Sequence, residues 1–129
     1  MKQTNFRLGN LIMYDGVVSK IASLNSNFDT IDIETPQGNI IHTRLEFIKP
    51  IELTIGWVKK LGFVYEGGMG YRSPDNTTYW HFSLANNFIP KIWYRNVIIS
   101  DNYKGCQFVH ELQNLYYFMF RVELEIVSH

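Results

Sequence analysis

Residues 11–24, with the sequence LIMYDGVVSKIASL, decide the fold class, because two apolar runs flank the pair Asp15-Gly16. An Asp-Gly pair between apolar runs is a strong signal for a β-hairpin with a two-residue turn. Behind this hairpin, residues 28–34 alternate apolar and polar side chains, and residues 40–45 follow the turn-forming residues 36–39. This succession of short strands in residues 1–50 predicts a small antiparallel meander or an SH3-like barrel.

The chain then changes character. Lys49-Pro50 breaks the strand pattern. Thr54 can cap a short helix that runs to about Leu61, and Gly62 suits the left-handed position behind it. Further strands are expected at residues 63–66, 71–72, 77–84 and 89–100, with residues 67–70 as a hairpin tip and residues 101–105 as a turn.

A longer helix is expected near the end of the chain, since apolar residues recur at helical spacing from Phe108 to about Met119. The alternation in residues 122–126 suggests a closing edge strand. We therefore expect an α+β protein, in which the β-meander or barrel of residues 1–50 packs with a second antiparallel sheet and two short helices in residues 51–129. The tight break near Pro50 predicts that the two parts form one compact unit.

Composition limits the function classes. The chain has 129 residues, of which 46% are hydrophobic and 19% charged, as in folded globular proteins. Twelve basic and twelve acidic residues balance, and residues 1–50 hold five of each sign. This balance gives no support to strong nucleic-acid binding, which usually draws on a basic excess. A single cysteine excludes an intramolecular disulfide, and no signal peptide or apolar span is visible, so we expect a cytoplasmic protein.

The glycines, cysteine, histidines and glutamates of this sequence form no pattern typical of a catalytic site or a metal site. The glycines of residues 67–70 lack the lysine of a phosphate loop and precede a strand, so a plain hairpin tip is the better interpretation. Cys106 and His110 lie four positions apart, but no further residues complete a metal-binding pattern with them. We expect Cys106 to be a buried small apolar side chain, as free cysteines usually are. Glu123 and Glu125 read as a solvated strand face. We therefore expect no catalytic residue, metal or cofactor.

Aromatic residues are abundant, at 16%, and two clusters of them fall on neighbouring strands, at residues 79–82 and 92–95. Successive side chains of a strand point to opposite faces of its sheet. If Trp80 and Ile92 face the core, one set of side chains shares the opposite face: Tyr79, His81, Trp93 and Arg95. Such a face is either a binding surface for protein or single-stranded nucleic acid, or it is covered by a helix.

Three segments resemble a family of small, mostly uncharacterised proteins of Bacteroidetes genomes and their phages and prophages. Residues 108–117 are similar to that family's "(Y/F)VHxLQNLYF" segment, which a short "LTGEEL"-like tail follows. Residues 7–16 resemble its "RIGNLVxYxG" opening, and residues 50–63 resemble its "PIPLTEEWLxKFGF" middle. Residues 119–124 depart from the usual tail, and residues 64–100 match no part of the family. The shared positions look structural, with Gly9, Gly16 and Gly62 at turns, Trp57 and Leu112 in the core, and Gln113 and Asn114 bonded to backbone near the helix end.

The resemblance supplies no catalytic residues and implies a mobile-element accessory protein. The first hypothesis is a non-enzymatic inhibitor that binds a host defence component, such as an RNA-guided nuclease or its guide RNA. Its expected contact residues are Tyr79, His81, Trp93 and Arg95, with Lys59, Lys60 and Lys91 as rim charges. The second hypothesis is a single-stranded RNA or DNA binder that stacks bases on the same rings. An enzyme is the third.

Overall fold

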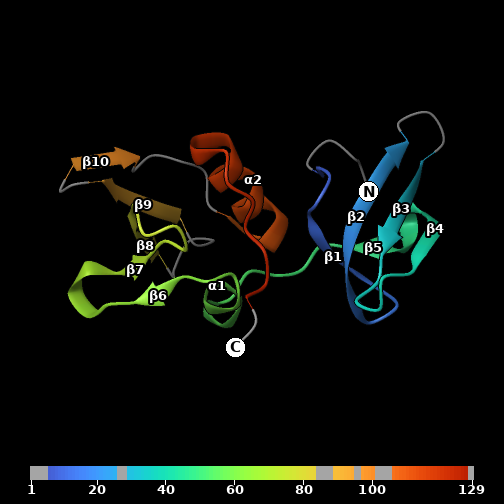
Figure 1. Ribbon diagram of the computed structural model, residues 1–129, viewed down its shortest axis with the longest axis horizontal. Coiled ribbons are helices and arrows are strands. Elements are labelled where there is room, and N and C mark those ends of the chain that lie inside the picture. The colour runs from blue at the N-terminus through green and yellow to red at the C-terminus, as the bar shows by residue number, and fades with distance from the viewer. Residues whose placement is uncertain (1–5, 26–28, 84–88, 95–96, 101–105, 128–129) are drawn as a thin grey trace. The chain divides into compact units, whose positions relative to one another are not determined.

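The computed structural model describes residues 6–25, 29–83, 89–94, 97–100 and 106–127. By its internal contacts the chain divides into two units. Unit 1 comprises Met1–Glu52 with Phe108–Glu123, and unit 2 comprises Leu53–Gln107 with Leu124–His129. Each unit contains one antiparallel sheet and one α-helix (Figure 1), so the expected α+β class is confirmed.

The sheet of unit 1 is a meander whose last strand returns to the first, in the order β4-β3-β2-β1-β5. Asp15 and Gly16 adopt φ angles of 50° and 77°, the left-handed conformation that a tight hairpin turn requires, so the predicted hairpin is confirmed. A register shift between Ile21 and Ser23 marks a bulge in the second strand. The elements are β1 (Leu11–Tyr14), β2 (Val17–Asn25), β3 (Thr30–Glu34), β4 (Ile40–Arg44), the 3-10 turn η2 (Leu45–Phe47) and β5 (Ile48–Lys49).

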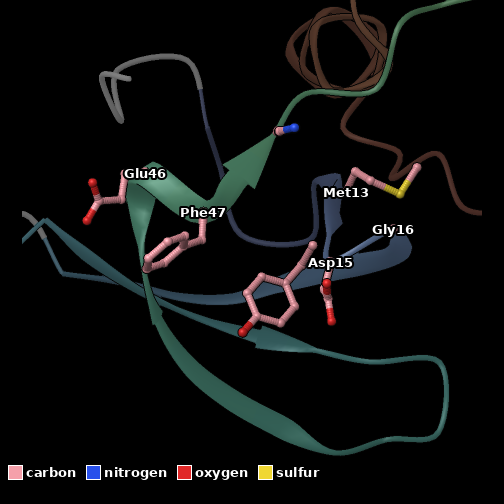
Figure 2. A pocket seen from close by; sticks show the side chains of 7 residues that line it. Met13, Asp15, Gly16, Glu46 and Phe47 are labelled. Atoms are coloured by element: carbon pink, nitrogen blue, oxygen red, sulfur yellow. The ribbon is translucent and has the colours of Figure 1, made fainter.

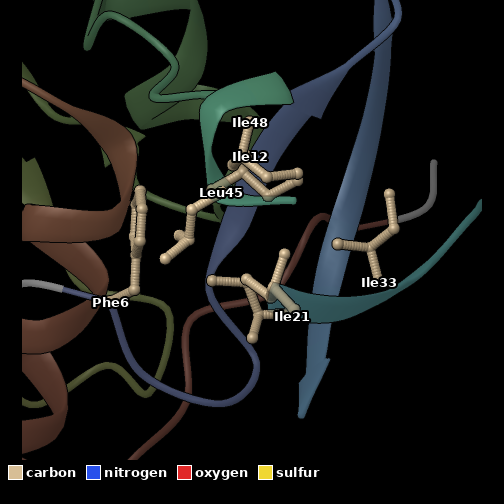
Figure 3. Packing of buried hydrophobic residues seen from close by; sticks show 7 residues of the cluster. Phe6, Ile12, Ile21, Ile33, Leu45 and Ile48 are labelled. Atoms are coloured by element: carbon tan, nitrogen blue, oxygen red, sulfur yellow. The ribbon is translucent and has the colours of Figure 1, made fainter. Parts of the chain in front are cut away.

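One face of this sheet carries the core of unit 1. Alternate residues of the strands point inward, as the period of two dictates, and η2 adds one leucine (Figure 3). Tyr14, Leu24 and Ile41 pack against the cluster and remain half-buried. The buried cluster consists of Phe6, Ile12, Ile21, Ile31, Ile33, Leu45 and Ile48.

The helix α2 (Val109–Phe120) belongs to unit 1, although it lies almost 60 residues beyond the meander in the sequence. The side chain of Gln113 bonds to backbone at the start of β1: its Oε1 accepts from Leu11 N at 2.8 Å, and its Nε2 donates to Gly9 O at 3.3 Å. These long-range hydrogen bonds tie α2 to the N-terminal segment, whereas the predicted division at residue 50 groups the helix with residues 51–129.

A second set of polar contacts joins the same two segments. Asn114 Oδ1 accepts from Asn10 Nδ2 at 2.8 Å and from Arg7 Nε at 3.1 Å. Arg7 also forms a two-pronged ion pair with Glu123, beyond the end of α2. Hydrogen bonds therefore join residues 7–11 to residues 113–114 of α2. Gln113 and Asn114 both bond to the N-terminal segment.

Unit 2 holds the second sheet, in the order β10-β9-β8-β7-β6 (Figure 1). Thr54 Oγ1 accepts from Trp57 N at the start of the short helix, and Gly62 behind it has a φ of 97°, both as predicted. Trp80 and Ile92 are fully buried. The elements are α1 (Ile55–Lys60), β6 (Val64–Tyr65), the 3-10 turn η3 (Gly67–Met69), β7 (Tyr71–Arg72), β8 (Tyr79–Ser83), β9 (Ile89–Tyr94) and β10 (Val97–Ser100).

The predicted closing strand at residues 122–126 is wrong. Arg121 adopts a φ of 56°, which ends α2 in the left-handed conformation, and residues 122–127 form no strand. Glu123 pairs with Arg7, and Val127 N donates to Lys60 O at 2.9 Å, so these residues are bonded to distant parts of the chain without forming a strand. No helix within the described residues is long and apolar enough to cross a membrane. The predicted turn at residues 101–105 lies outside the described residues.

Candidate functional site

The aromatic face predicted from the sequence lies on the sheet of unit 2. Tyr79 of β8 is directly opposite Trp93 of β9, and Arg72 of β7 is directly opposite Tyr79. Side chains of directly paired residues share one face of a sheet. We call this surface, formed by Arg72, Tyr79, His81 and Trp93, the Tyr79–Trp93 face.

The opposite face explains why these rings are held in place. Trp80 and Ile92, one position along each strand, are fully buried, and Trp80 Nε1 donates to Thr78 Oγ1 at 2.8 Å. The Trp80 ring also contacts Phe63 edge-on, with ring centroids 5.6 Å apart. A slip of one residue would expose this core, so the register that presents Tyr79 and Trp93 is strongly fixed.

A carboxylate lies among the polar groups of the Tyr79–Trp93 face. Glu66 Oε1 accepts from the Tyr79 hydroxyl at 3.1 Å, and Glu66 Oε2 lies 3.0 Å from Arg72 Nη1. The hydrogen bond to Glu66 raises the pKa of Tyr79 above its usual value. The phenol therefore stays protonated at neutral pH, and the Arg72 charge is balanced by Glu66.

The face is neither fully open nor covered. Tyr79, His81 and Trp93 are each half-buried. The Trp93 Nε1 atom is shielded from solvent and has no hydrogen-bond acceptor among the residues that the structure describes. The His81 ring lies against the turn at Gly70, where an added Cβ would approach it to 3.1 Å.

The remaining predicted contact residues are placed only in part. Arg95 lies outside the described residues, and for Lys91 the structure describes only the backbone, which pairs with His81. Lys59 and Lys60 are exposed on α1. The Lys60 ammonium lies 4.7 Å from the centre of the Trp57 ring, so this charge is already engaged in a cation–π contact.

Unit 1 contains a surface cavity that the sequence did not predict. Its volume is about 590 Å³, within the range of small-molecule sites. The β1–β2 turn forms one wall, and η2 with the start of β5 forms the other (Figure 2). We call it the Tyr14–Phe47 hollow, and the residues that line it are Met13, Tyr14, Asp15, Gly16, Glu46, Phe47 and Lys49.

A serine, an aspartate and a histidine meet on the solvent side of unit 1 without forming a nucleophilic triad. Ser23 Oγ donates to Asp32 Oδ2 at 2.8 Å, and His42 Nδ1 lies 2.6 Å from Asp32 Oδ1. The hydroxyl bonds to the carboxylate and not to the imidazole, which is not the order of contacts in a Ser-His-Asp triad. The bond from His42 lowers the pKa of Asp32 below its usual value.

Cys106 and His110 are both buried, and the expected burial of Cys106 is confirmed. His110 packs between two rings, with centroid distances of 4.7 Å to Phe6 and 5.8 Å to Phe108. Burial lowers the pKa of His110, which favours the neutral imidazole. Within the part of the chain that the structure describes, no three histidine, cysteine or acidic side chains are grouped as metal ligands would be.

Sequence reasoning found the two rings of the Tyr79–Trp93 face and missed their polar partners. Glu66 and Arg72 flank the glycine turn, and this position on the two arms of the expected hairpin is the only sequence signal for them. The sequence signal for the Tyr14–Phe47 hollow was weaker still. It was limited to Phe47, an apolar residue directly before Ile48 and Lys49 of β5. In comparisons with protein families, curated proteins and solved structures, nothing matches this chain.

Proposed function

We propose that this chain is a non-enzymatic accessory protein of a phage or prophage that binds and inhibits a host defence component in the bacterial cytoplasm. The target class that the family resemblance suggests first is an RNA-guided nuclease, which makes the chain an anti-CRISPR protein. The proposed contact surface is the Tyr79–Trp93 face.

The observation that carries this proposal is the in-register row of Arg72, Tyr79 and Trp93 across three strands. Tyrosine, tryptophan and arginine are the residues most enriched at the energetic centres of protein interfaces. The tyrosine and tryptophan rings lose little conformational entropy on binding, because each has only two side-chain torsions. They lose less still where the strand register already orients them.

The charge arrangement of the face favours a protein surface over nucleic acid. The Glu66 carboxylate lies beside Arg72 and Tyr79, so an approaching phosphate would meet a negative charge and an arginine that is already paired. Protein partners tolerate such a paired charge, whereas nucleic-acid affinity depends on free basic groups that replace counterions. Base stacking on Tyr79 and Trp93 remains the basis of the second candidate, a single-stranded nucleic-acid binder.

Inhibition can be measured directly with purified components. Guide-loaded nucleases of several types are incubated with the full chain, and the fraction of labelled target cleaved is followed over time. The proposal expects dose-dependent loss of cleavage with at least one nuclease. Trp93→Ala and Tyr79→Ala should each weaken inhibition by roughly tenfold or more, the loss typical of interface hot spots.

Phe118→Ala is the matched control, because Phe118 is a ring in unit 1 that is 75% exposed. It should inhibit as the wild type does, and thermal unfolding of each variant shows whether the fold is intact. Absence of inhibition by the wild-type chain across the nucleases would overturn the proposed function whatever the variants do. Tight, strongly salt-dependent binding of free single-stranded oligonucleotides would instead support the second candidate.

A further inference from the structure

The Tyr14–Phe47 hollow has walls that are fixed by backbone pairing. β1 pairs on both sides, so that Tyr14 is opposite Val17 of β2 and Ile48 of β5. The Asp15-Gly16 turn closes one end in its left-handed conformation. A cavity held in this way exists before any ligand arrives, so little ordering cost opposes binding.

The aromatic ring at this hollow is not needed by the core. Within η2, Leu45 is 3% exposed and enters the buried cluster, whereas Phe47 is 56% exposed. The Phe47 side chain lies on the opposite side of the hollow from Asp15 (Figure 2). Tyr14 contributes a second ring, half-buried against the core, so two π-systems line one small cavity.

The residues that line the hollow carry one more negative charge than positive. Asp15 and Glu46 are carboxylates at its two walls, against the single ammonium of Lys49. Glu46 pairs with Arg44 at 3.0 Å, but both side chains are exposed. Exposed ion pairs contribute little free energy, so Glu46 can leave Arg44 for another cation at small cost. Unit 1 as a whole has eight acidic and six basic residues, which disfavours a polyanion.

We propose that the Tyr14–Phe47 hollow binds the side chain of an arginine in an extended segment of a partner protein. A guanidinium is planar, stacks on aromatic faces and pairs with a carboxylate at its edge, and the hollow offers rings and Asp15 together. The site lies wholly in unit 1 and uses none of the residues of the Tyr79–Trp93 face. The outcome of a test of arginine binding in the hollow is therefore independent of the function proposed above.

The test is an amide NMR titration of the full chain with a capped Gly-Gly-Arg-Gly-Gly peptide. The matched probe replaces arginine by citrulline, which keeps the shape and removes the charge. We expect saturable shifts at residues 13–17 and 45–49, with the arginine peptide bound roughly fivefold more tightly than the citrulline peptide, as a cation–π contact beside a carboxylate implies.

Two conservative variants separate the contributions. Asp15→Asn removes the carboxylate and keeps the turn, since Asn-Gly suits the same hairpin, and Phe47→Leu removes the ring and keeps an apolar side chain. Each should weaken arginine binding by roughly threefold or more. Phe118→Leu, at an exposed ring elsewhere in unit 1, should leave it unchanged. Equal binding of the citrulline peptide, shifts centred on other residues, or no saturable shift would each overturn the proposal.

Discussion

At the scale of single residues, Gly70 links the hairpin turn to the Tyr79–Trp93 face. Its φ of 86° and ψ of −140° lie in a region that L-residues avoid. A Cβ there would approach the backbone oxygen of Trp80 to 2.6 Å, closer than any ordinary contact. The strand β8 can therefore pass close to the turn only because residue 70 has no side chain.

Gly70→Ala should lower the free energy of unfolding by about 2–4 kcal/mol, since backbone strain and a backbone clash combine. Chemical denaturation monitored by tryptophan fluorescence measures this change. Gly68→Ala, in the same turn, is the control: Gly68 has no atom within 4 Å of a built Cβ and no positive φ. A loss of similar size in both variants would show that the turn, and not the contact with Trp80, is the sensitive feature.

At the scale of elements, α2 is attached to unit 1 by side-chain amides as well as by apolar packing. Gln113 is 1% exposed and serves the start of β1 as a neighbouring strand would, by accepting from one backbone amide and donating to one carbonyl. Val109, Leu112 and Tyr116 are fully buried on the same helix. The helix therefore contributes both core surface and hydrogen-bond partners to the sheet.

Gln113→Leu keeps the volume and removes both hydrogen bonds. Because the Leu11 amide is then left buried without its acceptor, the free energy of unfolding should fall by about 1–3 kcal/mol. The measurement is urea denaturation of the variant and the wild type. Gln37→Leu, at an exposed turn position of unit 1, should change stability by no more than about 0.5 kcal/mol, and an equal loss there would contradict this account.

The first turn of α2 also makes the stability of unit 1 sensitive to acid. His110 is 3% exposed, its Nδ1 has no hydrogen-bond partner within the described part of the chain, and burial lowers its pKa. The nearby Glu111 opposes that shift, but its carboxylate is bonded to the Phe108 amide at 2.9 Å. The helix N-terminus also disfavours a positive charge at this position.

Below the ordinary histidine pKa the unfolded chain binds a proton that the folded chain rejects, so stability should fall as pH drops from about 7 to 5. The slope from this one group is at most about 1.4 kcal/mol for each pH unit. Urea denaturation across this range measures it. His110→Phe should flatten the dependence, while Phe118→Leu, at an exposed ring of the same helix, should retain it. An unchanged slope in His110→Phe would remove His110 as the cause.

At the scale of the whole molecule, the sequence predicted elements better than their assembly. The Asp15-Gly16 turn and the Thr54 cap were predicted because each depends on the chemistry of adjacent residues. The attachment of α2 to the N-terminal segment was not, since the bond between Gln113 and Leu11 joins residues 102 positions apart. The spacing of hydrophobic residues indicates which face of a helix is buried, but it does not indicate which other element that face packs against.

The candidate face shows the same limit. Strand alternation separated Tyr79 and Trp93 from the buried Trp80 and Ile92. The contact of Glu66 with Tyr79 depends on how the turns at residues 67–70 and 73–78 set the register of three strands. That register is a property of the folded chain, so only the structure could bring the carboxylate to the face.

The chain leaves unit 1 after residue 52 and returns to it at residue 108, which has a consequence for how the segment between can be altered. Val109 N donates to Ile51 O at 2.8 Å, and Leu53 N donates to Gln107 O at 3.0 Å, so residues 51–53 and 107–109 are paired where the main segment of unit 2 begins and ends. That segment has the connectivity of an inserted module, whose ends are held together by its host. Residues 54–106 can therefore be exchanged as one piece while the hydrogen bonds between α2 and the N-terminal segment are kept.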